Sequence, residues 1–283
     1  MTTAEWISKA RGVVPSSDSA NRLLGLLGRP AISNDEIVAV IRCDGVLTAK
    51  LLQLCNSPVM GLRQRVASVD QALFLLGHSE VFRIVMAISY SAAMKAPVPG
   101  YAVAGKEFFR HSLATAAAAE IVQERGFWNG GETHLAFTAG LLQDLGELVI
   151  DRALTPELVA RMRERVEKDG LSRVEAEREI LQTDHAEIGA GVLRSWNLPD
   201  DLVEAVAHHH QPVLDPTPRL SVVSHLADCL AHLAGAAPGW GGYAVRVSEA
   251  VIQHFRIDPD RLDAMVIATR GSIERMDKFS SGL

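Results

Sequence analysis

Histidine and carboxylate side chains that could hold a metal or transfer protons recur through the second half of the chain. In order along the sequence they are Glu107, His111, Asp144, His185, His209, His210 and Asp228. Imidazoles and carboxylates supplied by several helices are the donors that a divalent metal needs inside a helical bundle. The residue types therefore predict a metal site, or a proton-transfer site, assembled from distant parts of the chain.

Two of these carboxylates stand in apolar surroundings, where a charge is costly to bury. Asp144 interrupts the apolar stretch 139–148, and Asp228 lies in the sequence LADCL. We expect histidines to receive both carboxylates. Two alternatives stay open, because Asp144 could accept hydrogen bonds from a helix N-terminus and Asp228 could pair with Arg219 or Arg246.

The histidines differ in how strongly their spacing indicates a ligand. Glu107 and His111 are four residues apart and share a helix face, a spacing that also suits an ordinary surface pair. His185 follows a predicted cap residue, so it could be a plain polar residue at a helix start. Of the run His208–His210, at most two can face one site, and we expect His208 to point elsewhere. We interpret the remaining histidines as surface or ordinary core residues: His78, His134, His225, His232 and His254.

Helical periodicity dominates the chain and predicts an all-α fold, a multi-helix bundle with an N-terminal and a C-terminal helical half. The sequence KAPVPG at 95–100 breaks the helical pattern and is the expected boundary between the two halves. The predicted parts are a leader helix over 1–17, a domain over 18–235 with halves 18–95 and 104–235, and a helical extension over 236–283.

The helices expected to position the site have recognisable ends. A helix over 104–126 carries Glu107 and His111, and its row of alanines allows close packing of a neighbour. One apolar helix over 132–152 is expected to carry Asp144. Helix-start signals precede the elements that follow, because serine, threonine and aspartate can cap free backbone amides. These caps are Ser68 in the first half and Thr155, Ser172 and Asp184 in the second.

Composition limits the classes of function. The 283 residues are 48% hydrophobic and carry a net charge of −6, whereas a non-specific nucleic-acid binder usually has a basic excess. The three cysteines, Cys43, Cys55 and Cys229, are too widely spaced to form a metal-binding pair and suit buried thiols in a reducing compartment. No apolar run is long enough to span a bilayer. We therefore expect a cytoplasmic protein without a nucleic-acid or membrane partner.

Order and spacing taken together resemble the HD superfamily of metal-dependent phosphohydrolases. The closer resemblance is to the HDOD family, the HD-related output domains of bacterial signal transduction, over about residues 18–235. The second half is accordingly identified as HD-like. The motifs that carry the resemblance are LLQLCNS (51–57), SVDQA (68–72), FFRHS (108–112), AGLLQDLG (139–146), DHAEIGA (184–190), WNLP (196–199) and HHQP (209–212). The resemblance implies that the seven histidines and carboxylates stand at positions similar to metal ligands.

The sequence departs from catalytic HD enzymes at three places. Those enzymes carry adjacent His and Asp ligands, but Gln143 stands where the histidine is expected, and an amide oxygen is a poor transition-metal ligand. Glu147 stands where the related phosphodiesterases of cyclic di-GMP usually have a lysine, and a carboxylate repels a phosphodiester. The segment after His210 reads QPVLDP and lacks their Asp-Gly-x-Gly-Tyr-Pro type of signature.

These departures predict a non-catalytic regulatory module of signal transduction with a degenerate metal site. It would bind a signalling partner protein in trans, or a nucleotide ligand, and would hold either no cofactor or a weakly bound divalent metal such as Fe, Mn or Ni. The turn at 56–61 and the charged helices near 157–180 are the expected contact surfaces. The alternative is a residual metal-dependent phosphohydrolase, and a third reading makes the polar set purely structural.

Overall fold

The computed structural model describes residues 5–6, 22–23, 25–26, 34–128, 133–217, 219–240 and 245–280. Within these ranges the predicted all-α fold is confirmed, and the only β feature is an isolated bridge between Val98 and Val103. Almost all of the predicted leader helix lies outside the described residues. No described helix is both long and apolar enough to cross a bilayer.

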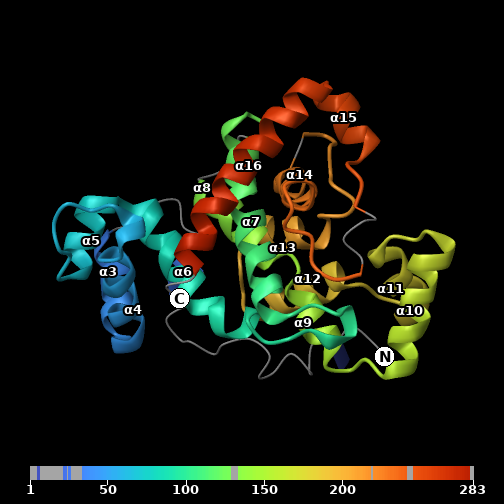
Figure 1. The fold of residues 1–283 in the computed structure, drawn as a ribbon, viewed down its shortest axis with the longest axis horizontal. Helices are drawn as coiled ribbons and strands as arrows, with labels where there is room; N and C mark the ends of the chain where they lie inside the picture. Colours follow the sequence, from blue (N-terminus) through green and yellow to red (C-terminus); the bar gives the residue numbers. More distant parts are fainter. Residues whose placement is uncertain are drawn as a thin grey trace.

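The N-terminal half forms a lobe at one end of the molecule (Figure 1). Its elements are α3 (Asn34–Arg42), α4 (Gly45–Cys55), η1 (Pro58–Met60), α5 (Val69–Leu76) and α6 (His78–Met94). The Asp44 carboxylate caps α4, and Ser68 caps α5 as its sequence predicts. The side chain of Asn56 bonds the carbonyl of Leu52 and both backbone groups of Val66. These local bonds fix the lobe, and α6 leads from it into the second half.

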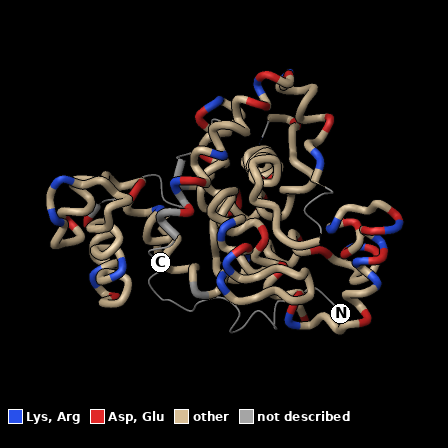
Figure 2. Tube along the Cα trace, viewed as in Figure 1, with Lys and Arg blue, Asp and Glu red and all other residues tan. Residues whose placement is uncertain are grey.

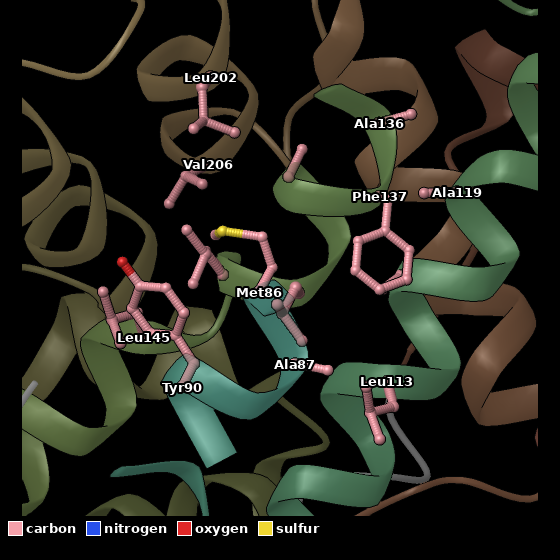
Figure 3. Packing of buried hydrophobic residues seen from close by; sticks show 14 of the residues in the cluster. Met86, Ala87, Tyr90, Leu113, Ala119, Ala136, Phe137, Leu145, Leu202 and Val206 are labelled. Carbon is pink, nitrogen blue, oxygen red and sulfur yellow. The ribbon is translucent and has the colours of Figure 1, made fainter. Parts of the chain in front are cut away.

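The second half packs around two central helices, α7 (Gly105–Glu124) and α14 (Leu220–Leu233). The remaining elements are η2 (Pro99–Tyr101), α8 (Thr133–Leu142), α9 (Leu145–Asp151), α10 (Pro156–Asp169), α11 (Arg173–Leu181), α12 (His185–Ser195), α13 (Asp200–Ala207), α15 (Glu249–Phe255) and α16 (Pro259–Ser280). Alanines on α7 allow α8 and α14 to approach closely. Figure 3 shows Met86 and Tyr90 of α6 meeting Leu145, Leu202 and Val206 in the shared core.

The single apolar helix expected over 132–152 is wrong, because the structure divides it into α8 and α9. The break falls at Gln143 and Asp144, just where the backbone at Asp144 leaves the helical region. Continuous apolar character hides this break, since both short helices are buried. Just after the break, Gly146 lies directly against the backbone of His185, closer than any side chain would allow.

Charged residues lie mostly toward the outside of the molecule (Figure 2), and Asp228 is the one Asp, Glu, Lys or Arg residue of α14. Helices α10 and α11 project at the end of the molecule opposite the N-terminal lobe (Figure 1). The caps Thr155 and Ser172 begin them as predicted. The long helix α16 packs along α7 and α14, and an ion pair between Arg110 and Asp277 fastens it there. The C-terminal extension therefore contributes to the same core as the site helices.

Candidate functional site

Six of the seven predicted site residues come together at one buried place in the second half. His111 comes from α7, Asp144 from the break before α9, His185 from the first position of α12, and Asp228 from α14. His209 and His210 follow the end of α13, while His208 is exposed. Five of the six line a cavity of about 240 Å³, and His209 is fully buried beneath it. Residues more than 100 positions apart thus share one site.

Asp144 is the centre of this cluster. Its Oδ2 lies 3.1 Å from Nε2 of His111, and its Oδ1 lies 3.6 Å from Nε2 of His185 and 3.7 Å from Nε2 of His209. His111 also reaches Asp228, whose Oδ1 is 3.2 Å from the same Nε2. Imidazoles therefore receive both buried carboxylates. Arg219 pairs with Glu204 instead, and among the described residues no ion pair joins Asp228 to Arg246 and no helix N-terminus receives Asp144.

The opposite nitrogen of each imidazole is held by a fixed oxygen. Nδ1 of His111 lies 2.7 Å from the carbonyl of Ala236, and Nδ1 of His209 lies 2.7 Å from the carbonyl of Val206. A carbonyl can only accept, so Nδ1 donates in both cases and Nε2 faces the cluster. This is the orientation that outer hydrogen bonds impose on metal-binding histidines.

His185 is oriented in the same way by Glu177, a carboxylate of α11 with no exposed surface. Oε2 of Glu177 accepts from both the backbone amide of His185 at 2.8 Å and its Nδ1 at 2.7 Å. The other oxygen accepts from the hydroxyl of Tyr101 at 2.8 Å. Glu177 therefore fixes both the start of α12 and the direction of the His185 ring.

The carboxylates favour protonated imidazoles at two positions. Burial lowers the pKa of His111, but its hydrogen bonds to Asp144 and Asp228 outweigh burial and raise the pKa to about 10. Burial likewise opposes the charge on His185, but Glu177 outweighs it and raises that pKa to about 10. Both imidazoles are therefore cationic at neutral pH in the protein alone.

The other two imidazoles of the cluster are neutral. Burial and the charge of His185 lower the pKa of His209, and burial, His209 and His185 lower that of His210 further. Nε2 of His185 and Nε2 of His210 are 2.8 Å apart. The cationic His185 donates in this contact and the neutral His210 accepts.

Both central carboxylates remain ionised. Burial acts to raise the pKa of Asp144, but the hydrogen bond and charge of His111 hold it far below its ordinary value. Burial acts in the same direction on Asp228, and His232 and His111 hold its pKa well below its ordinary value. The cluster therefore pairs two negative carboxylates with two positive imidazoles, which is the charge that a dication could supply instead.

Glu147, expected to repel a phosphate, is neutralised within the structure. Its carboxylate forms an ion pair with Arg173 of α11, and both side chains are largely buried. The Arg173 guanidinium also donates to the carbonyl of Pro238 at 3.2 Å and lies over the ring of Tyr101. Burial raises the pKa of Glu147 and the Arg173 charge opposes that shift. The position therefore carries a bound pair rather than a free cation or a free anion.

Glu107 does not join the cluster, contrary to the predicted ligand set. It is exposed, and its Oε2 accepts from the backbone amide of Ala104 at 3.2 Å. A carboxylate in the first turn of a helix is drawn to the free amides there. Glu107 therefore caps the start of α7, and its spacing of four residues from His111 does not indicate a shared site.

Gln143 is buried, with 1% of its surface exposed. Neither Oε1 nor Nε2 of its amide has a hydrogen-bond partner among the described residues. Gln143 also does not line the cavity. No imidazole is therefore supplied from this position, as the sequence indicated.

Three residues near the cluster were not foreseen as part of it: Arg173, Glu177 and His232. His232 lies one helical turn after Asp228, so its i, i+4 spacing could have identified it. Glu177 and Arg173 reach the site only through side-chain contacts of α11, Arg173 with Glu147 of α9 and Glu177 with His185 of α12, and no local pattern marks them.

The donors present fit a divalent metal. Adjacent ligands on a metal with bonds of about 2.1 Å lie roughly 3.0–3.4 Å apart, close to the 2.8–3.7 Å that separates neighbouring donors of the cluster. Nε2 of His209 is buried and has no hydrogen-bond partner among the described residues. Mixed imidazole and carboxylate donors suit Fe, Mn, Ni or Zn.

A protein-family model and several solved structures match this chain. A model of the HDOD domain family matches residues 14–212. An HDOD domain protein of unknown function from Geobacter sulfurreducens has a similar structure, with a TM-score of 0.66 and 20% identity, covering 99% of this chain and 95% of that one. A candidate signal transduction protein from Marinobacter aquaeolei VT8 gives 0.74 and 23%, covering 94% and 59%.

Two further relatives complete the comparison. A candidate phosphohydrolase from Shewanella amazonensis SB2B has a TM-score of 0.70 and 23% identity, covering 97% of each chain. An uncharacterised protein from Treponema pallidum is 23% identical over 244 residues, which make up 82% of this chain and 44% of that protein. This chain therefore spans less than half the length of that relative. The structural likenesses show a shared fold.

Proposed function

This chain belongs to the HDOD domain family, and on that premise we propose that it is a regulatory module of signal transduction that binds a divalent metal without hydrolysing phosphodiesters. The observation that carries the proposal is the Asp144 cluster, in which three imidazoles present Nε2 to one carboxylate while fixed oxygens hold their Nδ1 atoms. Such outer contacts are the ordinary accompaniment of a metal site.

The residues divide the work of holding the metal. Asp144 supplies charge and contacts both sides of the cluster, and His111, His185 and His209 supply nitrogen donors. Glu177 and the carbonyls of Ala236 and Val206 orient those donors and fix which nitrogen carries the proton. A bound divalent metal would supply Lewis-acid attraction for an anionic ligand.

We expect no hydrolysis because Arg173, a cationic side chain near Asp144, is already paired with a carboxylate and is not free to bind a phosphate. Phosphodiester hydrolysis needs positive groups that stabilise charge on the phosphate as the reaction proceeds. Arg173 is a cation beside the cluster, and it is bound to Glu147 and to the carbonyl of Pro238. Using it for a phosphate would leave the buried Glu147 carboxylate without its partner, a loss that costs several kcal/mol.

Regulation would pass through the projecting pair of helices α10 and α11. The turn between them, including Gly170 and Ser172, lines the cavity on its inner side. On the outer side, i, i+4 ion pairs such as Arg163–Glu167 and Lys168–Glu164 keep α10 charged and solvated. A partner protein bound to these helices in trans would shift the position of Arg173, the first residue of α11. That shift would change how the cavity binds its ligand.

A residual phosphohydrolase is the second candidate, favoured by a second arginine. Arg246 lines the cavity together with Arg173, and guanidinium groups suit phosphate recognition. The same feature suits a nucleotide ligand that is bound but not cleaved.

Hydrolysis of a generic phosphodiester by the metal-loaded protein separates the two candidates. We expect the rate with Mn²⁺ or Fe²⁺ to equal that of an Asp144→Asn variant, in which the central carboxylate is lost. A metal-dependent rate well above that of the variant would contradict the proposal and establish the phosphohydrolase. Gln143→His provides the reverse test, since a new imidazole there is expected to strengthen metal binding.

A further inference from the structure

His232 stands beside the cluster on α14, one helical turn after Asp228. Its Nδ1 lies 2.9 Å from the backbone carbonyl of Asp228 and 3.2 Å from Oδ1 of the same residue. Its ring meets the ring of His111 edge to face, with centroids 4.7 Å apart. His232 therefore touches two members of the cluster and lines the same cavity.

The second nitrogen of His232 has no hydrogen-bond partner in the part of the chain that the structure describes. Only 7% of the side-chain surface is exposed, and Nε2 is buried without a hydrogen bond to any described residue. Because Nδ1 donates to the Asp228 carbonyl, a neutral His232 has its lone pair on Nε2. A buried acceptor without a donor is costly, so this nitrogen calls for a ligand of its own.

A neighbouring histidine shows what a satisfied imidazole at this cavity looks like. His225 also lines the cavity from α14, but its Nδ1 donates to the carbonyl of His209 at 2.7 Å. Its Nε2 accepts from the backbone amide of Ser248 at 2.9 Å. Both ring nitrogens of His225 are therefore hydrogen-bonded within the protein, whereas among the described residues only Nδ1 of His232 is.

The donors around His232 have the spacing of a metal shell. One donor atom each from His111, Asp228 and His232, where either ring nitrogen of a histidine counts as the donor, lie within 4.8 Å of one another. Oδ2 of Asp144 lies 3.1 Å from the His111 donor and adds a fourth ligand on the same side. Two imidazoles and two carboxylates are a sufficient set for a four-coordinate divalent metal.

We propose that His232 is a metal ligand, which completes with His111 and Asp228 a cation position on the Oδ2 side of Asp144. This inference rests on the proposed function, because it assumes that the cluster binds a metal. It restores the number of imidazoles that Gln143 removes from the set, and the added donor comes from α14 instead of the break between α8 and α9.

The test uses His232→Asn in the full chain. The asparagine amide can keep the hydrogen bond from the Nδ1 position to the Asp228 carbonyl but offers no nitrogen lone pair at the Nε2 position. His254→Asn on α15 is the matched control, since His254 is exposed and outside the cavity. Thermal unfolding of both metal-free variants shows whether each is folded.

Cobalt(II) titration followed by visible absorption gives the affinity, and proton NMR counts the shifted N–H signals of ligating histidines. His232→Asn is expected to weaken binding at this position by about 100-fold and to remove one shifted signal, while His254→Asn matches the wild type. Wild-type affinity and an unchanged signal count in a folded His232→Asn protein would overturn this inference and leave metal binding intact. A wild-type protein that binds no Co²⁺ would overturn the proposed function and this inference with it.

Discussion

Replacing Glu177 of α11 by glutamine tests whether this carboxylate orients His185 for metal binding. Glu177 has no exposed surface and receives Tyr101, the amide of His185 and Nδ1 of His185. Glutamine has the same shape and can keep one acceptor oxygen for His185 while its amide donates to the Tyr101 hydroxyl. The substitution thus removes the charge with little change in packing.

The magnitude follows from that loss of charge. A hydrogen bond to a charged group contributes about 1.5–3 kcal/mol and a neutral one about 0.5–1.5 kcal/mol, so we expect a loss of about 1–2 kcal/mol of stability in the metal-free protein. Without the carboxylate, Nε2 of His185 is less basic and therefore a weaker metal ligand. The metal affinity is expected to fall by about 10–100-fold.

Two assays and one matched control decide this prediction. Urea unfolding measures the stability, and Co²⁺ titration measures the affinity. Glu179→Gln on the same helix is the control, because Glu179 forms an exposed ion pair with Arg165, and such pairs contribute about 1 kcal/mol or less. A Glu177→Gln protein with the metal affinity of the control would refute the role assigned to Glu177.

Two further predictions concern packing and pH. Gly146→Ala would place a methyl group 2.9 Å from the amide nitrogen of Gly189 and closer still to the carbonyl of His185; we expect a loss of about 1–3 kcal/mol in urea unfolding, whereas Gly45→Ala, with no atom near its added methyl, is neutral or stabilising. Burial raises the pKa of Glu120 from 4.5 to about 7 despite the Arg83 guanidinium 2.8 Å away. The stability linked to this raised pKa is complete below pH 4.5 and is lost as the pH rises through 7. The loss is about 3 kcal/mol, and Glu120→Gln is expected to abolish that part of the pH dependence; an identical pH profile in wild type and variant would contradict the assignment.

Local sequence signals predicted much of the scaffold correctly. Caps such as Thr155, Ser172 and Asp184 begin their helices as expected, because a side-chain oxygen followed by a helical pattern acts within a single turn. The break between α8 and α9 escaped prediction, because the apolar run continues across it and the close contact of Gly146 with the backbone of His185 is tertiary. Local chemistry fixes the ends of helices, but tertiary packing decides where an apolar run is interrupted.

The site shows the same division. The residue types and their order along the chain identified the residues around Asp144. A carboxylate in an apolar run needs a hydrogen-bonding or cationic partner, and the histidines were the available ones. The spacing of Glu107 and His111 suggested a shared role, but a free amide at the helix start recruits Glu107 instead. Glu177 and Arg173 carry no pattern of their own, because they meet Glu147 and His185 only once the chain has folded.

The most direct test of the account is the metal content of the protein purified without chelator or nickel resin and equilibrated with Fe²⁺ or Mn²⁺. We expect at least one tightly held metal per wild-type chain, and its loss in Asp144→Asn, because Asp144 contacts three of the imidazoles. A wild-type protein that retains no metal under these conditions, and whose unfolding temperature is the same with and without added metal, would contradict the account. The histidines and carboxylates would then be a hydrogen-bonded core that stabilises the bundle.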